Sequence, residues 1–155
     1  MSSQSFRAPA PARRAGVTDT PTGAVRGDTG LLRMVLRLDA IATAAVGVAA
    51  LAGCALLDSA LGLPTAFLAG VGAFLTLYAL VVWRIGTPGQ PNRNAVRTVI
   101  ALNLVWMADS VAMALAGWFD PTGLGTALIV LQAIAVLGFA DLQLFGLRKA
   151  NRSAL

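Results

Sequence analysis

The side chains with the most chemical potential in this sequence are polar groups set inside long apolar runs. Asp109 lies deepest, and Asn103, Trp106 and Ser110 fall with it in a sector of about 120° on a helical projection. An aspartate near the centre of a bilayer costs about 2.5 to 3.5 kcal/mol on insertion scales, so it needs a partner, a water-filled cavity, a proton or a role. We therefore expect this polar face to point into a helix bundle.

The simplest role for Asp109 is structural, as a protonated or hydrogen-bonded group with Ser110, Thr76 or Gln132 as its partner. A second interpretation is a site for a proton, an ion or a ligand. A third is a buried contact with a partner protein.

The fourth apolar run carries polar residues on opposite faces. Gln132 and Gln143 nearly eclipse each other on a helix, whereas Asp141 lies about 180° from Gln132. These three side chains therefore cannot all face one cavity.

Another set of polar residues lies near the inner ends of the runs, where long arginine stems can reach a carboxylate. We expect these residues to form a polar layer, with the members Arg37, Asp39, Tyr78, Arg97, Asn103 and Asp141. The plainer alternative is a set of interfacial salt bridges that fix the register of the helices.

Most catalytic chemistries lack their residues here. The sequence has 0 His and 1 Cys, and all its acidic residues are Asp. Metal hydrolysis, haem ligation and a His-assisted nucleophile therefore have no ligands or bases. We expect no catalytic residues, no metal and no cofactor, and hence a protein that is not an enzyme.

The elements that hold these residues are four apolar runs. The chain is 57% hydrophobic and 12% charged, with mean hydropathy +0.73, whereas a soluble domain is about 25% charged. We expect spans at about 36–57, 64–83, 97–118 and 123–147, within a transmembrane domain of residues 31–150. Short connections predict an all-α polytopic protein, an antiparallel four-helix transmembrane bundle. Residues 1–30 are expected to be a disordered cytoplasmic tail, and 151–155 a second one.

The basic residues predict the orientation. All 12 Lys and Arg lie before or at the start of the first run, between the second and third runs or at the start of the third, or after the fourth, while the other two connections carry Asp58 and Asp120. Lys and Arg stay on the cytoplasmic side, so both termini are predicted to be cytoplasmic in a bacterial plasma membrane. The pI of the chain is 11.1. Because its Arg residues flank spans, we expect them to attract anionic lipid headgroups and not nucleic acid.

Two further patterns leave alternatives open. Leu51-Ala52-Gly53-Cys54 has the form of a bacterial lipoprotein signal, but the apolar run continues beyond Cys54, so a buried small residue is the plainer interpretation. Small residues at four-residue spacing, such as Ala108, Ala112 and Ala116, let helices approach closely. That spacing serves packing within the chain or a homo-oligomer interface equally well.

Four short motifs resemble those of small uncharacterised four-helix integral membrane proteins of high-GC bacteria: Leu36-Arg37-Leu38-Asp39, Ile100-Ala101-Leu102-Asn103, Gly117-Trp118-Phe119-Asp120-Pro121-Thr122 and Leu131-Gln132-Ala133. The resemblance covers about residues 31–150 and implies the four-helix architecture without an activity. Small multidrug-type transporters have a similar size, but they use a membrane-embedded Glu in the first span, which this chain lacks.

Two functional hypotheses follow. The first is a non-catalytic membrane bundle that acts as an accessory or scaffold subunit and binds a membrane protein partner, a second copy or lipid. The alternative is a small transporter or channel with a proton-linked carboxylate at Asp109.

Overall fold

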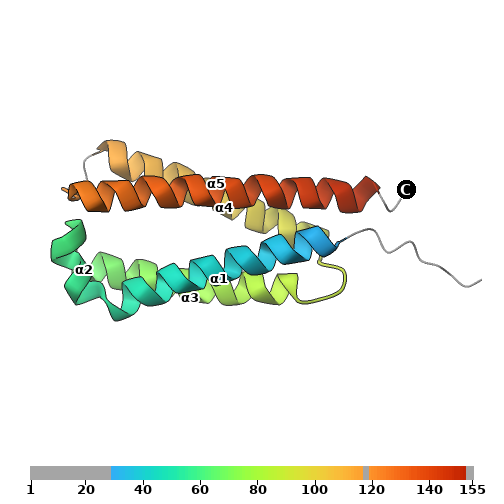
Figure 1. The fold of residues 1–155 in the computed structure, drawn as a ribbon, viewed down its shortest axis with the longest axis horizontal. Coiled ribbons are helices and arrows are strands. Elements are labelled where there is room, and N and C mark those ends of the chain that lie inside the picture. Colours follow the sequence, from blue (N-terminus) through green and yellow to red (C-terminus); the bar gives the residue numbers. More distant parts are fainter. Residues whose placement is uncertain (1–28, 117–118, 153–155) are drawn as a thin grey trace, which may run out of the picture.

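The computed structural model describes residues 29–116 and 119–152, and these are organised as helices joined by short connections (Figure 1). The helices are α1 (Gly30–Ala52), α2 (Cys54–Leu61), α3 (Thr65–Gly86), α4 (Arg93–Ala116) and α5 (Gly123–Arg152). Four of them, all except α2, are long and apolar enough to cross a membrane. The described part of the chain is therefore all-α, with four helices typical of a multi-pass membrane protein. The expected N-terminal tail lies almost entirely outside the described residues.

The first span differs from its predicted limits of about 36–57. Helix α1 begins at Gly30 and ends at Ala52, and the chain bends at Gly53 before α2. The N–H of Gly53 still donates to Ala49 O, and the N–H groups of Leu56 and Leu57 donate to Gly53 O. Glycine is a common point for a sharp helix bend. Helix α2 consequently crosses the end of the bundle instead of continuing the span (Figure 1).

The spanning helices associate mainly as two hairpins. Helix α1 packs most extensively on α3, and α4 packs on α5, while α1 and α5 join the two hairpins and α3 barely touches α4. Glycines permit the closest approach: a Cβ on Gly72 would lie 2.6 Å from Leu51 N, and one on Gly146 would lie 3.1 Å from Leu32 Cα. In lipid, where apolar surface gains little from burial, such backbone proximity stabilises helix pairs through van der Waals contact.

Polar side chains fix the start of each later span. Asp58 accepts hydrogen bonds from the backbone N–H and the hydroxyl of Thr65 at the start of α3. Asn92 Oδ1 accepts from the N–H groups of Asn94 and Ala95 at the start of α4. Such bonds satisfy the first amides of a helix, which have no partner within it.

The starts of α1 and α5 are tied to other parts of the chain. Thr122 Oγ1 donates to Ala60 O at 2.7 Å and accepts from Gly125 N, so α5 starts against the end of α2. At the opposite end, Arg33 Nη2 donates to Thr87 O and Arg37 Nε to Gly86 O, both at 3.3 Å. These arginines satisfy the free carbonyls at the end of α3.

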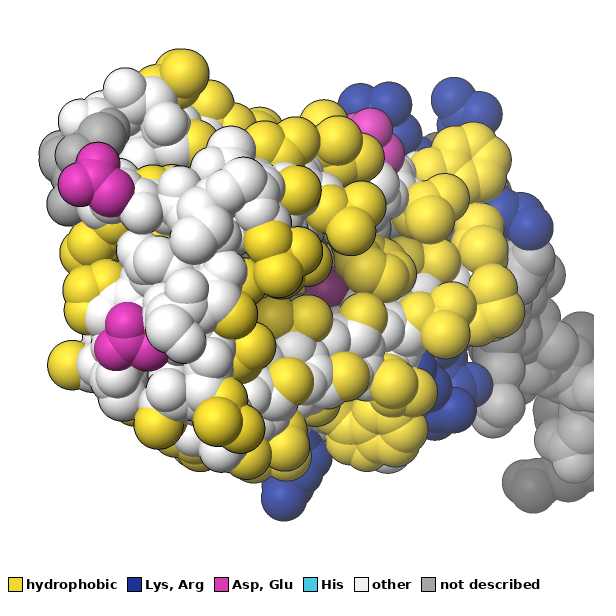
Figure 2. All heavy atoms as spheres, turned by 60° about the vertical axis from the view of Figure 1, so that its left-hand side comes forward, with side chains coloured by type: hydrophobic (Ala, Val, Ile, Leu, Met, Phe, Trp, Pro, Cys, Tyr) yellow, Lys and Arg dark blue, Asp and Glu magenta, His cyan; other side chains and the backbone are white. Residues whose placement is uncertain are grey.

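The apolar core is small and the apolar surface is large. A core cluster that includes Leu36, Val82, Val99 and Leu147 joins all four spans. Many other large hydrophobic side chains are exposed, and they cover the sides of the molecule in Figure 2. This distribution suits a bundle whose sides face lipid.

Candidate functional site

The interior of the bundle holds three buried polar side chains. Asp39 on α1 is 1% exposed, Asn103 on α4 is 3% exposed and Gln143 on α5 is 0% exposed. In α1, Asp39 follows the inward-facing residues Leu32, Val35 and Leu36 at helical spacing, so it must face the interior as they do. Asp39 lies about 13 Å along α1 from the start of the helix at Gly30.

The two amides hold the carboxylate between them. Asn103 Nδ2 donates to Asp39 Oδ2 at 3.0 Å, and Gln143 Nε2 donates to the same oxygen at 2.7 Å. The two amides also meet each other, since Asn103 Nδ2 lies 3.4 Å from Gln143 Oε1. Residues far apart in sequence thus form one hydrogen-bonded unit.

Two hydroxyl groups complete this unit. Tyr78 OH donates to Asn103 Oδ1 at 2.9 Å, and Thr43 Oγ1 donates to Asp39 Oδ1 at 3.2 Å. We call the five residues Asp39, Thr43, Tyr78, Asn103 and Gln143 the polar cluster. It draws on α1, α3, α4 and α5 and therefore links all four spans.

The electrostatics of the polar cluster are those of a carboxylate surrounded by neutral donors. Within the part of the chain that the structure describes, the side-chain partners of Asp39 are Asn103, Gln143 and Thr43, and no Lys or Arg pairs with it. Hydrogen bonds from these donors offset part of the cost of burying the carboxyl group.

Asp109 occupies a very different position. It is exposed on α4 and makes no hydrogen bond or ion pair with another described residue. Ser110 is half-buried, and its hydroxyl donates to Trp106 O of the same helix at 2.8 Å. The expected polar face of this span is therefore divided between the interior, which Asn103 enters, and the surface, where Asp109 lies. About 120° of helical rotation separates these two residues, so one narrow interface cannot cover both.

In the fourth span, the two glutamines and Asp141 lie on opposite faces of the helix, as predicted. Gln143 is buried and Gln132 is half-buried, whereas Asp141 is exposed. Asp141 therefore lies outside the polar layer that the sequence analysis placed it in, and Gln143 takes the position beside Asp39.

The arginines expected in that layer also lie elsewhere. Arg37 is half-buried, donates to Gly86 O, and has its guanidinium 5.8 Å from the ring centroid of Trp83. Arg97 is exposed. Both side chains thus remain at the end of the molecule that carries the α3–α4 connection, where a cation keeps its hydration. Of the predicted layer, the structure brings together Asp39, Tyr78 and Asn103.

Thr43 is the one member of the polar cluster that the sequence analysis did not single out. It lies one helical turn after Asp39, and an i, i+4 spacing of hydroxyl and carboxylate is the signal that could have identified it.

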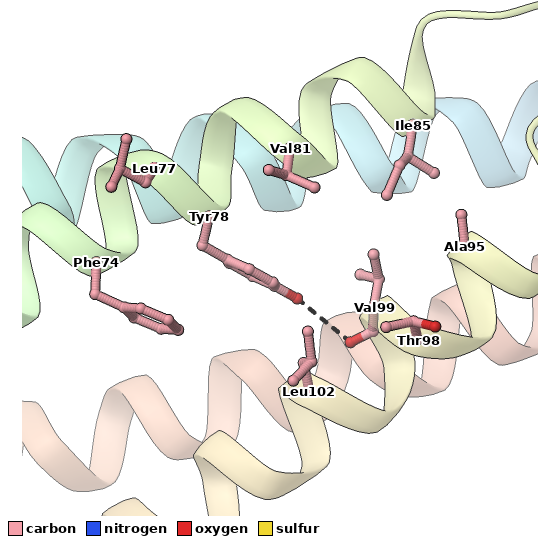
Figure 3. A pocket seen from close by; sticks show the side chains of 9 residues that line it. All are labelled: Phe74, Leu77, Tyr78, Val81, Ile85, Ala95, Thr98, Val99 and Leu102. Atoms are coloured by element: carbon pink, nitrogen blue, oxygen red, sulfur yellow. Dashed lines mark hydrogen bonds between the residues drawn. The ribbon is translucent and has the colours of Figure 1, made fainter.

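A shallow apolar groove of about 550 Å³ lies beside the polar cluster, between α3 and α4 (Figure 3). Phe74, Val81 and Ile85 line it from α3, and Val99 and Leu102 line it from α4. Tyr78 lines it too, and its hydroxyl points across the groove toward Val99 O at 3.3 Å (Figure 3). The groove offers apolar contact and almost no polar groups.

The remaining reactive groups are scattered. Among residues 29–116 and 119–152, no three His, Cys, Asp or Glu side chains lie close enough together to hold a metal ion. Cys54 is a free, half-buried thiol at the start of α2. As a small residue within a helix, Cys54 is expected to stay unlipidated, and the intact mass of the purified chain should equal that of the unmodified chain.

Comparison with protein-family models, curated proteins and solved structures gives no match to this chain. The resemblance to small four-helix membrane proteins stays an expectation from the sequence.

Proposed function

We propose that this chain is a non-catalytic accessory or scaffold subunit of a bacterial plasma membrane, which binds a membrane protein partner or lipid. In this proposal the four spans form an antiparallel bundle with both termini in the cytoplasm. Side chains in the interior hold the bundle together, and the exterior binds the partner protein or lipid.

The observation that carries the proposal is the set of hydrogen bonds that the polar cluster makes to Asp39. Each oxygen of Asp39 accepts at least one hydrogen bond, and the donors come from α1, α4 and α5. All three donors are neutral side chains, and two of them belong to other spans, which supports a structural role for Asp39.

The distribution of charge supports the proposed orientation. Within the described ranges, basic side chains gather near the α3–α4 connection and the end of α5, namely Arg33, Arg37, Arg84, Arg93, Arg97, Arg148, Lys149 and Arg152. Asp58 and Asp120 lie at the opposite end, and Figure 2 shows acidic side chains on the near end with basic ones farther away. The basic end suits a cytoplasmic leaflet with anionic headgroups, at about 1 kcal/mol per residue near the surface.

A purification in mild detergent combined with a flux assay tests the proposal. From native membranes, we expect the tagged full chain to elute with one membrane protein at a fixed stoichiometry or with a retained anionic lipid. In vesicles, the purified chain should leave an imposed proton gradient intact. A proton flux that Asp39→Asn or Asp109→Asn abolishes in folded protein would overturn the proposal in favour of a transporter.

A further inference from the structure

The outer half of α4 is less covered by the rest of the bundle than its inner half. The buried residues of α4 are Val96, Val99, Ile100 and Asn103, all in the half that begins at Arg93. From Leu104 to Ala116 every side chain of α4 is exposed or half-buried. In Figure 1, α4 diverges from α3 toward the end that carries α2. The outer half of α4 therefore has a surface that the rest of the chain leaves largely uncovered.

Asp109 lies on this uncovered face. At 1.5 Å per residue, about 10 Å of helix separates it from the end of α4 at Ala116, which places it within the apolar part of the span. It has no hydrogen-bond or ion-pair partner among the described residues. Acyl chains cannot supply a donor, so a polar group from another molecule would lower the cost of an aspartate here.

The surroundings of Asp109 have the spacing of a helix-packing seam. Leu102, Val105, Asp109, Ala112 and Ala116 follow one another at alternating three- and four-residue intervals, and all five are exposed. This spacing aligns them on one face, as in the contact line between two packed helices. The alanines toward the outer end permit close approach of a second helix.

The negative charge of Asp109 indicates which kind of helix can pack on this seam. A second copy of the chain offers no cation at this depth, because no Lys or Arg occurs between Arg37 and Arg84 or between Arg97 and Arg148. Two copies that meet through this seam would instead bring two Asp109 carboxylates together, and like charges repel. A helix with a Lys or Arg at the same depth would neutralise Asp109.

We propose that the outer half of α4 is a docking surface for a partner transmembrane helix that carries a Lys or Arg in its outer half. The ion pair with Asp109 sets the depth of the partner, and the seam from Leu102 to Ala116 supplies the packing. This inference rests on the proposed function as an accessory subunit and names the chemistry of its protein partner.

Synthetic helices in vesicles test the pairing directly. The full-length chain carries a dye on an N-terminal tag, and the probe is a labelled polyleucine transmembrane peptide with one Lys at the depth of Asp109. Matched peptides carry Leu at that position or carry the Lys near the inner end. Energy transfer between the two dyes reports association. We expect the first peptide to bind at least about tenfold more tightly than the other two.

Variants of the chain assign the effect to Asp109. Asp109→Asn and Asp109→Ala should reduce binding of the Lys peptide at least about tenfold, to the level of the Leu peptide. Asp141→Asn is the matched control, since Asp141 is another exposed carboxylate on a spanning helix and its loss should leave binding unchanged. Asp109→Lys should regain association with a peptide that carries Asp at the same depth. Helix content and unfolding temperature of each variant verify that it is folded.

Three results would overturn the inference. The Leu peptide could bind as well as the Lys peptide, the Asp109 variants could bind like the parent, or the chain alone could self-associate in a manner that depends on Asp109. If a stoichiometric native partner stays bound to the Asp109→Asn chain, the docking surface lies elsewhere while the proposed function stands. Proton flux without a partner would instead reject the proposed function itself.

Discussion

At the scale of single residues, Asp39 shows how a carboxyl group can lie inside a helix bundle with neutral side chains as its partners among the described residues. Three hydrogen bonds from Thr43, Asn103 and Gln143 replace the water that the carboxylate would have at the surface. If Asp39 were removed, Gln143 Nε2 and the Thr43 hydroxyl would lose this acceptor, and Asn103 Nδ2 would keep only Gln143 Oε1. An unsatisfied buried donor costs about 1 to 3 kcal/mol, so the polar cluster stabilises the bundle only while it is complete.

Two substitutions of Asp39 should therefore behave oppositely. In Asp39→Asn the carbonyl oxygen can accept from both amides, and the new NH₂ can donate to Thr43 Oγ1, because a hydroxyl both donates and accepts. We expect this variant to unfold close to the parent temperature in detergent. Asp39→Leu leaves Gln143 Nε2 without its acceptor and should lower the free energy of unfolding by about 1 to 3 kcal/mol.

Asp141→Leu is the control for these measurements. Asp141 is exposed, so its replacement by an apolar residue leaves no buried donor unpaired. We expect no loss of stability. Equal unfolding temperatures for Asp39→Leu and the parent chain would show that the polar cluster contributes nothing to stability.

At the scale of elements, the α1–α3 pair depends on glycines that face each other. A Cβ on Gly47 would lie 2.8 Å from Thr76 N, and one on Gly72 would lie 2.8 Å from Gly47 O. These neighbours are backbone atoms, which cannot move aside without separating the helices. The close packing of α1 on α3 also brings Asp39 and Tyr78, which lie on these two helices, near enough to share the polar cluster.

Gly72→Ala should consequently weaken the bundle, and Gly70→Ala on the same helix should not. A Cβ on Gly70 meets nothing within 4 Å, and alanine favours a helix over glycine by up to about 1 kcal/mol. For Gly72→Ala we expect a loss of about 1 to 3 kcal/mol in the free energy of unfolding, as is typical of overpacking. Thermal unfolding in detergent compares the two variants, and equal stability would contradict the close packing of α1 on α3.

At the scale of the whole molecule, the charge difference between the two ends predicts the topology. Reporter fusions after residue 28, near Gln90 and after Asn151 should all report the cytoplasm. Insertions near Ala60 and Gly123 should report the outside, because Lys and Arg near spans are retained in the cytoplasm. An extracytoplasmic signal near Gln90 would exclude the proposed four-span topology.

Some of this architecture was predictable because it depends on composition along the chain. Four long apolar runs and the absence of His and Glu need no knowledge of packing, and four helices of the structure are long and apolar enough to span a membrane. The break at Gly53 was missed because a glycine bends a helix only where the segment after it finds new contacts, and here α2 packs on α3 and α5.

The sequence by itself determined which segments are apolar and where charge is placed, since both follow from the free energy of transferring each side chain from water to lipid. Only the tertiary structure decided which polar residues meet. Asp39 and Gln143 are 104 positions apart, and their contact depends on how α1 and α5 are rotated and how closely small residues let them approach. The same rotation of α4 that turns Asn103 inward leaves Asp109 outside. A hydropathy pattern places a residue along a span, but packing against neighbouring helices sets its direction.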